Sequence, residues 1–68
     1  MNHWYDRLVE ERDQLKAKVD RLAEMLNDWP LGQLKFTPKS DYAVFHEQYI
    51  YMKNYLKVLD YRVEHEKP

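Results

Sequence analysis

The sequence has no cysteine, which excludes disulfides, thiolate metal sites and cysteine nucleophiles. Glycine occurs once and proline three times among the 68 residues. An all-β chain of this length needs several turns and more of these residues, so helical structure is favoured. No run of apolar residues approaches the roughly 20 that a membrane-spanning helix requires. We therefore expect an all-α protein with no membrane partner.

An excess of charge of either sign is also missing. Eleven basic residues oppose twelve acidic ones, for a formal net charge of -1. A protein that coats nucleic acid needs a clear basic excess, so a nucleic-acid polymer is disfavoured as a partner. Apolar residues make up 44% of the chain, which is typical of a folded domain rather than a disordered one. The composition therefore predicts one folded domain over residues 1–68.

The first part of the chain has the pattern of an amphipathic helix over about residues 3–27. Leucines recur every seven residues beside a companion row with the same spacing, and neither glycine nor proline interrupts the range. The leucine row is Leu8, Leu15 and Leu22, and the companion row is Tyr5, Arg12, Val19 and Leu26. Most of the remaining positions are polar, as expected for a helix with one buried face.

An ordered connector is predicted over residues 28–40. Pro30 cannot continue a helix, and Gly32 supplies the only unrestricted backbone in the chain. Residues 37–38 offer a helix start as an N-cap followed by proline, and residues 40–41 offer a later start. Four large apolar side chains are expected to cap this end of a hairpin: Trp29, Leu31, Leu34 and Phe36.

A second amphipathic helix is predicted over about residues 41–64. It carries one apolar stripe with alternating spacings of three and four residues, and a second row beside it. A helical hairpin needs only one stripe on each helix, so the second row is left for a subunit interface or a ligand groove. The stripe is Tyr42, Phe45, Tyr49, Met52, Leu56, Leu59 and Val63, and the second row is Val44, Gln48, Tyr51, Tyr55, Val58 and Arg62.

The two helices are expected to form an antiparallel two-helix hairpin that assembles into a homo-oligomer. A single core in so small a chain seldom contributes more than about 3–5 kcal/mol, and no disulfide adds to it. Self-association would cover the spare row and add to the buried area. The expected hairpin core is Leu8, Leu15, Val19, Leu22, Leu26, Phe45, Tyr49, Met52, Leu56 and Leu59.

Neither catalysis nor metal binding is well supported by the residues present. The only serine, Ser40, fits a helix cap, and the neighbouring Glu10 and Glu11 fit a solvated helix face. His46 and Glu47 diverge by about 100° on a helix, so they do not chelate one ion together. We therefore expect no enzyme activity, no metal and no cofactor.

Arg12 is the most informative polar residue, because it interrupts an otherwise apolar row. Three interpretations are open: a side chain that snorkels at a helix edge, a buried group that sets the register between subunits, or a cation that grips an anion or stacks on a base. In the third, Tyr5 would close the pocket from one heptad before, and Lys16 would reach a phosphate from one turn after. Arg62 presents the same choice and is the candidate for a second site.

The spacing on both helices is similar to that of a known family. Residues 12–26 read R-x-x-L-x-x-K-V-x-x-L-x-x-M-L, and residues 48–63 read Q-x-x-x-M-x-x-Y-x-x-x-L-x-x-R-V. The chain resembles a family of small phage helical-hairpin proteins that includes the anti-CBASS sponges. The resemblance covers nearly the whole chain.

The resemblance implies a hexamer that binds cyclic di- or trinucleotide immune signals at its subunit interfaces and sequesters them without cleavage. It also implies that the protein acts in the cytoplasm of the host bacterium. Arg12 falls where the family stacks a base, a position at which an aromatic residue is common. Asn27 falls near the position of a lysine that makes polar contact. Arg62 matches an arginine of the closing helix, associated with larger cyclic ligands.

A different class of function fits the same residues. The chain would then be a coiled-coil-like, homo-oligomeric protein-interaction module with no small-molecule ligand. The spare row on the second helix requires a partner in either case. A hexamer follows from the resemblance, and a dimer is the smaller alternative.

Overall fold

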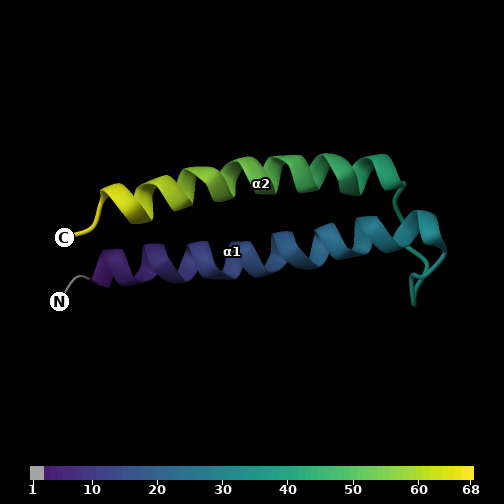
Figure 1. Cartoon of the computed structure of the whole chain (residues 1–68), viewed down its shortest axis with the longest axis horizontal. Coiled ribbons are helices and arrows are strands. Elements are labelled where there is room, and N and C mark those ends of the chain that lie inside the picture. Colours follow the sequence, from purple (N-terminus) through teal and green to yellow (C-terminus); the bar gives the residue numbers. More distant parts are fainter. Residues whose placement is uncertain (1–2) are drawn as a thin grey trace.

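The computed structural model describes residues 3–68, which form two long antiparallel helices joined at one end (Figure 1). Helix α1 spans His3–Asp28, a turn of 3-10 helix (η1) spans Trp29–Leu31, and helix α2 spans Tyr42–His65. The molecule measures 47 × 18 × 17 Å along its principal axes. The prediction of an all-α, two-helix hairpin is confirmed. Within the described residues, no helix is long and apolar enough to cross a membrane.

Helix α1 ends in a turn that proline and glycine shape together. Pro30 lies in η1, and Gly32 follows with a φ of 69°, in the left-handed region that glycine enters without steric cost. The Gly32 N–H donates to the Trp29 carbonyl at 3.1 Å, and the Gln33 N–H donates to the Asp28 carbonyl at 3.1 Å. These bonds use carbonyls that the helix end would otherwise leave unpaired.

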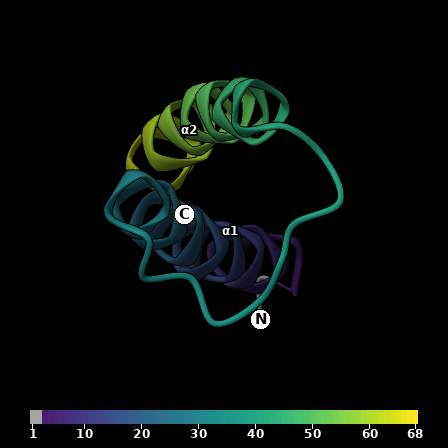
Figure 2. The same ribbon diagram turned by 90° about the vertical axis from the view of Figure 1, so that its right-hand side faces the viewer.

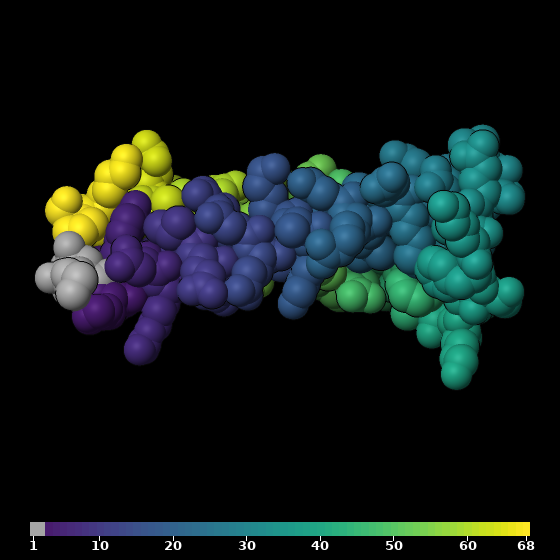
Figure 3. Space-filling model, turned by 90° about the horizontal axis from the view of Figure 1, so that it is seen from below, coloured from purple at the N-terminus to yellow at the C-terminus, as the bar shows by residue number. Residues whose placement is uncertain are grey.

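The connector covers less apolar surface than its composition predicts. The Trp29 ring packs against Tyr42, with 5.4 Å between ring centroids, and against Phe45, with 5.7 Å. Leu31 and Phe36, in contrast, are 67% and 58% exposed, so the expectation that they cap the hairpin is wrong. After the left-handed turn the chain runs as a wide loop outside the two helices (Figure 2) and thickens that end of the molecule (Figure 3).

Helix α2 begins at the later of the two starts that the sequence offers. Asp41 is extended, with φ −68° and ψ 156°, and its carbonyl accepts a hydrogen bond from the Val44 N–H at 3.0 Å. Its side chain makes no capping hydrogen bond, but a negative charge at a helix N-terminus is favourable. At the other end, the Glu66 N–H donates to the Arg62 carbonyl at 2.8 Å and closes the last turn.

The core follows the line of contact between the helices. Leu59 is fully buried and forms a cluster with Leu8 and Val63 near the open end of the hairpin. Val63 belongs to the predicted stripe but was not among the expected core residues. The buried residues of the described chain are Leu8, Val19, Leu26, Leu59 and Val63. The other expected core residues are partly buried, because two helices cover each stripe from one side only: Leu15, Leu22, Phe45, Tyr49, Met52 and Leu56.

Candidate functional site

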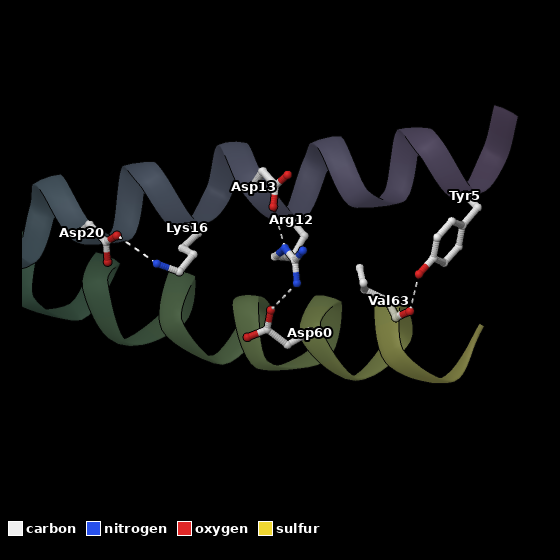
Figure 4. A network of polar contacts seen from close by, with 7 residues as sticks. All are labelled: Tyr5, Arg12, Asp13, Lys16, Asp20, Asp60 and Val63. Carbon is white, nitrogen blue, oxygen red and sulfur yellow. Dashed lines mark hydrogen bonds and ion pairs between the residues drawn. The ribbon is translucent and has the colours of Figure 1, made fainter. Parts of the chain in front are cut away.

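Arg12 lies at the edge of the helix contact, where two carboxylates hold its guanidinium (Figure 4). Its Nε donates to Asp13 Oδ1 at 2.7 Å, and its Nη1 donates across the hairpin to Asp60 Oδ1 at 3.2 Å. These two hydrogen bonds raise the pKa of Arg12 above its ordinary value, so the group stays charged. The side chain is 26% exposed. Arg12 therefore covers apolar surface with its stem and presents a partly desolvated planar cation at the edge.

Tyr5 closes the open end of the hairpin. Its hydroxyl donates to the Val63 carbonyl at 2.6 Å, in the last turn of α2, where carbonyls lack donors within the helix. The Trp4 ring packs edge-on against the Tyr5 ring, with 5.6 Å between centroids. Along α1, Tyr5 lies about 10 Å from Arg12, at 1.5 Å per residue. The hydroxyl of Tyr5 is thus used within the fold, and its ring remains at the end of the Arg12 edge.

Lys16 is the neighbour of Arg12 one turn further along α1. Its Nζ lies 3.4 Å from Asp20 Oδ2, in a pair whose side chains are 61% and 66% exposed. An exposed pair of this kind is weak, so the ammonium group can exchange Asp20 for another anion. Figure 4 shows Tyr5, Arg12 and Lys16 on the side of α1 that faces α2.

Asn27 lies near the other end of α1, about 16 Å beyond Lys16 along the helix axis. It borders a hollow of about 220 Å³ between the helices. The Tyr42 and His46 rings, which also border this hollow, are stacked with 6.0 Å between centroids. The full lining is Ala23, Leu26, Asn27, Tyr42, His46 and Tyr49. A single protomer does not bring Asn27 together with Arg12.

Arg62 is held by a carboxylate on its own helix. Its Nε and Nη2 donate to the two carboxylate oxygens of Glu66, at 2.7 Å and 3.1 Å. This bidentate pair raises the pKa of Arg62 and lowers the pKa of Glu66. Both side chains are exposed enough for solvent to screen the pair, at 44% and 38%. Arg62 is therefore charged and already occupied.

The two arginines lie on opposite edges of the hairpin. On one edge Arg12 bonds to Asp60, and on the other the Tyr55 hydroxyl donates to the Glu11 carboxylate. Glu11 and Arg12 are successive residues, about 100° apart around α1, so these two cross-helix bonds flank the core. Arg62 lies one heptad after Tyr55 on α2 and therefore on the same edge, and the charge of Glu11 also raises its pKa. The predicted site residues thus divide into an Arg12 edge, with Tyr5 and Lys16, and a separate Arg62 edge.

The sequence analysis missed two groups that shape these sites. Asp60 pairs with Arg12. This partner can be identified only when the register of the two antiparallel helices, which packs Leu8 against Leu59, is known. His46 joins the hollow beside Asn27, and its signal was the aromatic spacing at residues 42, 46 and 49. No group of three or more histidine, aspartate or glutamate side chains in the described chain is placed to hold a metal ion.

A comparison with known protein families matches residues 2–65 to the family described as Sequestin. The chain belongs to the Sequestin family. The match spans both helices and the connector, and therefore includes all five candidate residues. Membership of the Sequestin family suggests a sequestering role. No curated protein and no solved structure matches the chain.

Proposed function

We propose that this protein is a phage anti-defence protein that binds cyclic di- or trinucleotide immune signals where two copies meet. It holds them without cleavage in the cytoplasm of the host bacterium, and so removes them from the receptors that they activate. Family membership supports the sequestering role. The nucleotide ligand rests on the likeness to the anti-CBASS sponges and on the chemistry of the Arg12 edge.

The observation that carries the proposal is the Arg12 guanidinium, held at the edge of an apolar helix contact. Its planar face suits stacking on a base, and its N–H groups suit hydrogen bonds to a phosphate. In the protomer those N–H groups are taken by Asp13 and Asp60. A phosphate carries the same sign of charge as these carboxylates and can replace one of them. Such an exchange keeps the half-buried cation paired throughout.

A site between two copies follows from the way the candidate residues are spread along α1. Arg12 and Asn27 are about 22 Å apart along the helix axis, too far to enclose one small ligand within a protomer. Two α1 helices that pair in antiparallel orientation would bring Asn27 of one copy toward Arg12 of another. Lys16 would then add a second cation, and the Tyr5 ring would close the outer end.

Sequestration without cleavage agrees with the groups on the Arg12 edge. A hydrolytic site needs a general base within hydrogen-bonding reach of an attacking water, or an activated nucleophile. The carboxylates of Asp13 and Asp60 instead accept hydrogen bonds from a guanidinium. The site therefore offers charge neutralisation and stacking, which bind a cyclic nucleotide and leave its bonds intact.

The apolar surface of α2 favours self-association, and with it a second candidate function. Among the described residues ten large apolar side chains are exposed and five apolar side chains are buried, the reverse of a self-sufficient core. Tyr51 and Tyr55, in the spare row, are 66% and 46% exposed. A hexamer, or at least a dimer, would cover them. A homo-oligomeric module that binds another protein and no nucleotide would use the same surface.

Calorimetric titration with a panel of cyclic di- and trinucleotides tests the proposal. We expect one class of ligand to bind and to be recovered intact by chromatography. Arg12→Ala is expected to weaken binding while light scattering shows an unchanged oligomer. Arg7→Ala removes an exposed arginine elsewhere on α1 and is the matched control. Failure of every ligand at tens of micromolar would favour the protein-interaction module, and recovery of cleaved ligand would contradict sequestration.

A further inference from the structure

A third stripe on α2 is neither part of the core nor part of the spare tyrosine row. Its positions are spaced by 4, 3, 4, 3 and 4 residues, which places them along one line of the helix. All of them are exposed in the protomer, and we call this line the outer seam. It consists of Ala43, Glu47, Ile50, Asn54, Lys57 and Tyr61.

A hollow of about 480 Å³ lies at the start of the outer seam. Four of its lining residues, Ala43, His46, Glu47 and Ile50, have the i, i+3, i+4, i+7 spacing of a hole that receives a knob from a facing helix. The methyl side chain of Ala43 leaves this hole open at its floor. The hollow therefore has the form of a helix-packing socket that none of residues 3–68 of the same chain occupies.

The spacing of the outer seam reads the same in both chain directions. A stripe of this kind can pair with its own copy in antiparallel orientation about a two-fold axis, so that each contact occurs twice. In the register that sets the first position of one copy opposite the last position of the other, the smallest side chain faces the largest, and a carboxylate faces an ammonium group. The layers place Ala43 opposite Tyr61, Glu47 opposite Lys57, and Ile50 opposite Asn54.

The antiparallel register is also the one that fills the hollow. Side chains on a helix lean toward the N-terminus of that helix. Tyr61 of a second copy would therefore start level with Ala43 and lean toward the level of Glu47, over the socket. The Tyr61 ring stacks on His65, with 3.8 Å between ring centroids, and Tyr61 is still 63% exposed, so it can serve as the knob. Parallel pairing would instead set Glu47 against Glu47 and Tyr61 against Tyr61, with the helix dipoles aligned unfavourably.

We propose that the outer seam is a two-fold, antiparallel interface between two copies of this chain. It runs beside the row of Tyr51 and Tyr55, with Tyr51 also lining the hollow, and it needs no ligand. A closed hexamer built from dimers requires two different kinds of contact, and the seam supplies one of them. Its tests use protein without nucleotide, so their outcome is separate from that of the sequestration experiment.

Disulfide trapping tests the seam directly, because the natural chain has no cysteine. We expect a mixture of the Ala43→Cys and Tyr61→Cys proteins to form a mixed disulfide dimer under mild oxidation. One chain of that dimer keeps its natural Tyr61 and the other keeps its natural Ala43. These two residues still face each other, so the contact at the far end of the seam is unchanged. Ala43→Cys alone should not cross-link, because its two copies would lie about 27 Å apart along the seam, far beyond the ~7 Å limit of a disulfide.

The control and the contrary outcomes of the trapping experiment are equally definite. Gln14→Cys on the exposed face of α1, mixed with Tyr61→Cys, should give no dimer above background. Efficient self-cross-linking of Ala43→Cys would mean parallel pairing and would overturn the proposal. Absence of the mixed dimer would mean that the seam faces no second copy, and would overturn it as well.

A charge exchange gives an independent test that keeps Tyr61 in place. Glu47→Lys and Lys57→Glu should each weaken dimerisation about tenfold, because each sets like charges in facing positions. The double exchange should restore the affinity, measured by sedimentation equilibrium. The Tyr51 hydroxyl donates to Glu47 at 3.0 Å, and this bond is lost in Glu47→Lys and in the double variant but is kept in Lys57→Glu. Recovery therefore reports the facing pair, and a double variant as weak as either single one would refute the antiparallel register.

Discussion

Asp60→Asn is expected to tighten nucleotide binding on the Arg12 edge while it weakens the hairpin only slightly. Asp60 accepts a hydrogen bond from Arg12 Nη1 at 3.2 Å, so it competes with a phosphate for the same donor. The substitution keeps the size and shape of the side chain and removes its charge. Most single changes near a binding site reduce affinity, so a gain is a distinctive outcome.

The structure sets the size of both effects. Arg12 is 26% exposed and Asp60 is 54% exposed. A pair at this level of exposure contributes about 0.2–1 kcal/mol to folding, so the free energy of unfolding should fall by less than about 1 kcal/mol. A competing charge near 4 Å is worth about 1 kcal/mol in water and more at a protein surface. If the removed competition is worth the lower value, about 1 kcal/mol, the dissociation constant for the nucleotide should fall about fivefold.

Calorimetry and urea unfolding, on the same preparations, measure the two effects. Asp6→Asn is the matched control, because it removes one negative charge from an exposed position of α1 away from Arg12. Affinity equal to that of the control would mean that Asp60 does not compete with the ligand. Weaker binding than in the natural protein would mean that Asp60 contacts the ligand, and would refute the exchange of carboxylate for phosphate.

Three further predictions address the fold and the assembly. Leu59→Ala should cost about 3 kcal/mol, most of what so small a core supplies, and circular dichroism should show substantial unfolding, whereas Leu31→Ala, at a side chain that is 67% exposed, should change little. Tyr5→Phe should lower the free energy of unfolding by about 1 kcal/mol in urea titrations, since it removes the hydrogen bond at the open end. Joint replacement of Tyr51 and Tyr55 by Glu should break the hexamer down to the dimer of the outer seam in light scattering, because carboxylates would be buried at the tyrosine interface. A natural chain that is monomeric at micromolar concentration would contradict the last of these.

The hairpin could be predicted from the sequence because its cause is periodic and local. The rows that begin at Leu8 and at Tyr42 show which face of each helix is buried, and Pro30 and Gly32 show where the first helix must end. Each of these signals lies within a few residues of its effect. The exposure of the second row, including Tyr51, could be predicted for the same reason, because one stripe is sufficient for a hairpin.

The partners of the candidate site could not be predicted, because they depend on how the two helices slide past each other. Arg12 and Asp60 are 48 residues apart, and nothing near either residue indicates their contact. The burial expected of Leu31 and Phe36 was wrong for a related reason. Hydrophobicity predicts that such residues tend to be covered, but the left-handed turn at Gly32 sends the loop outside the helices.

The position of the buried cluster has a consequence for the order in which the chain folds. Leu8, Leu59 and Val63 meet at the end of the hairpin that has no covalent connection, and the Tyr5–Val63 hydrogen bond joins residues 58 positions apart. A hairpin that zips from its loop therefore reaches this cluster last, after the turns nearer the connector have paired. Buried Leu26 and the contacts of the Trp29 ring with Tyr42 and Phe45, at the connector end, would form before it. Trimming either terminus would thus remove contacts that form late, and should mainly speed unfolding.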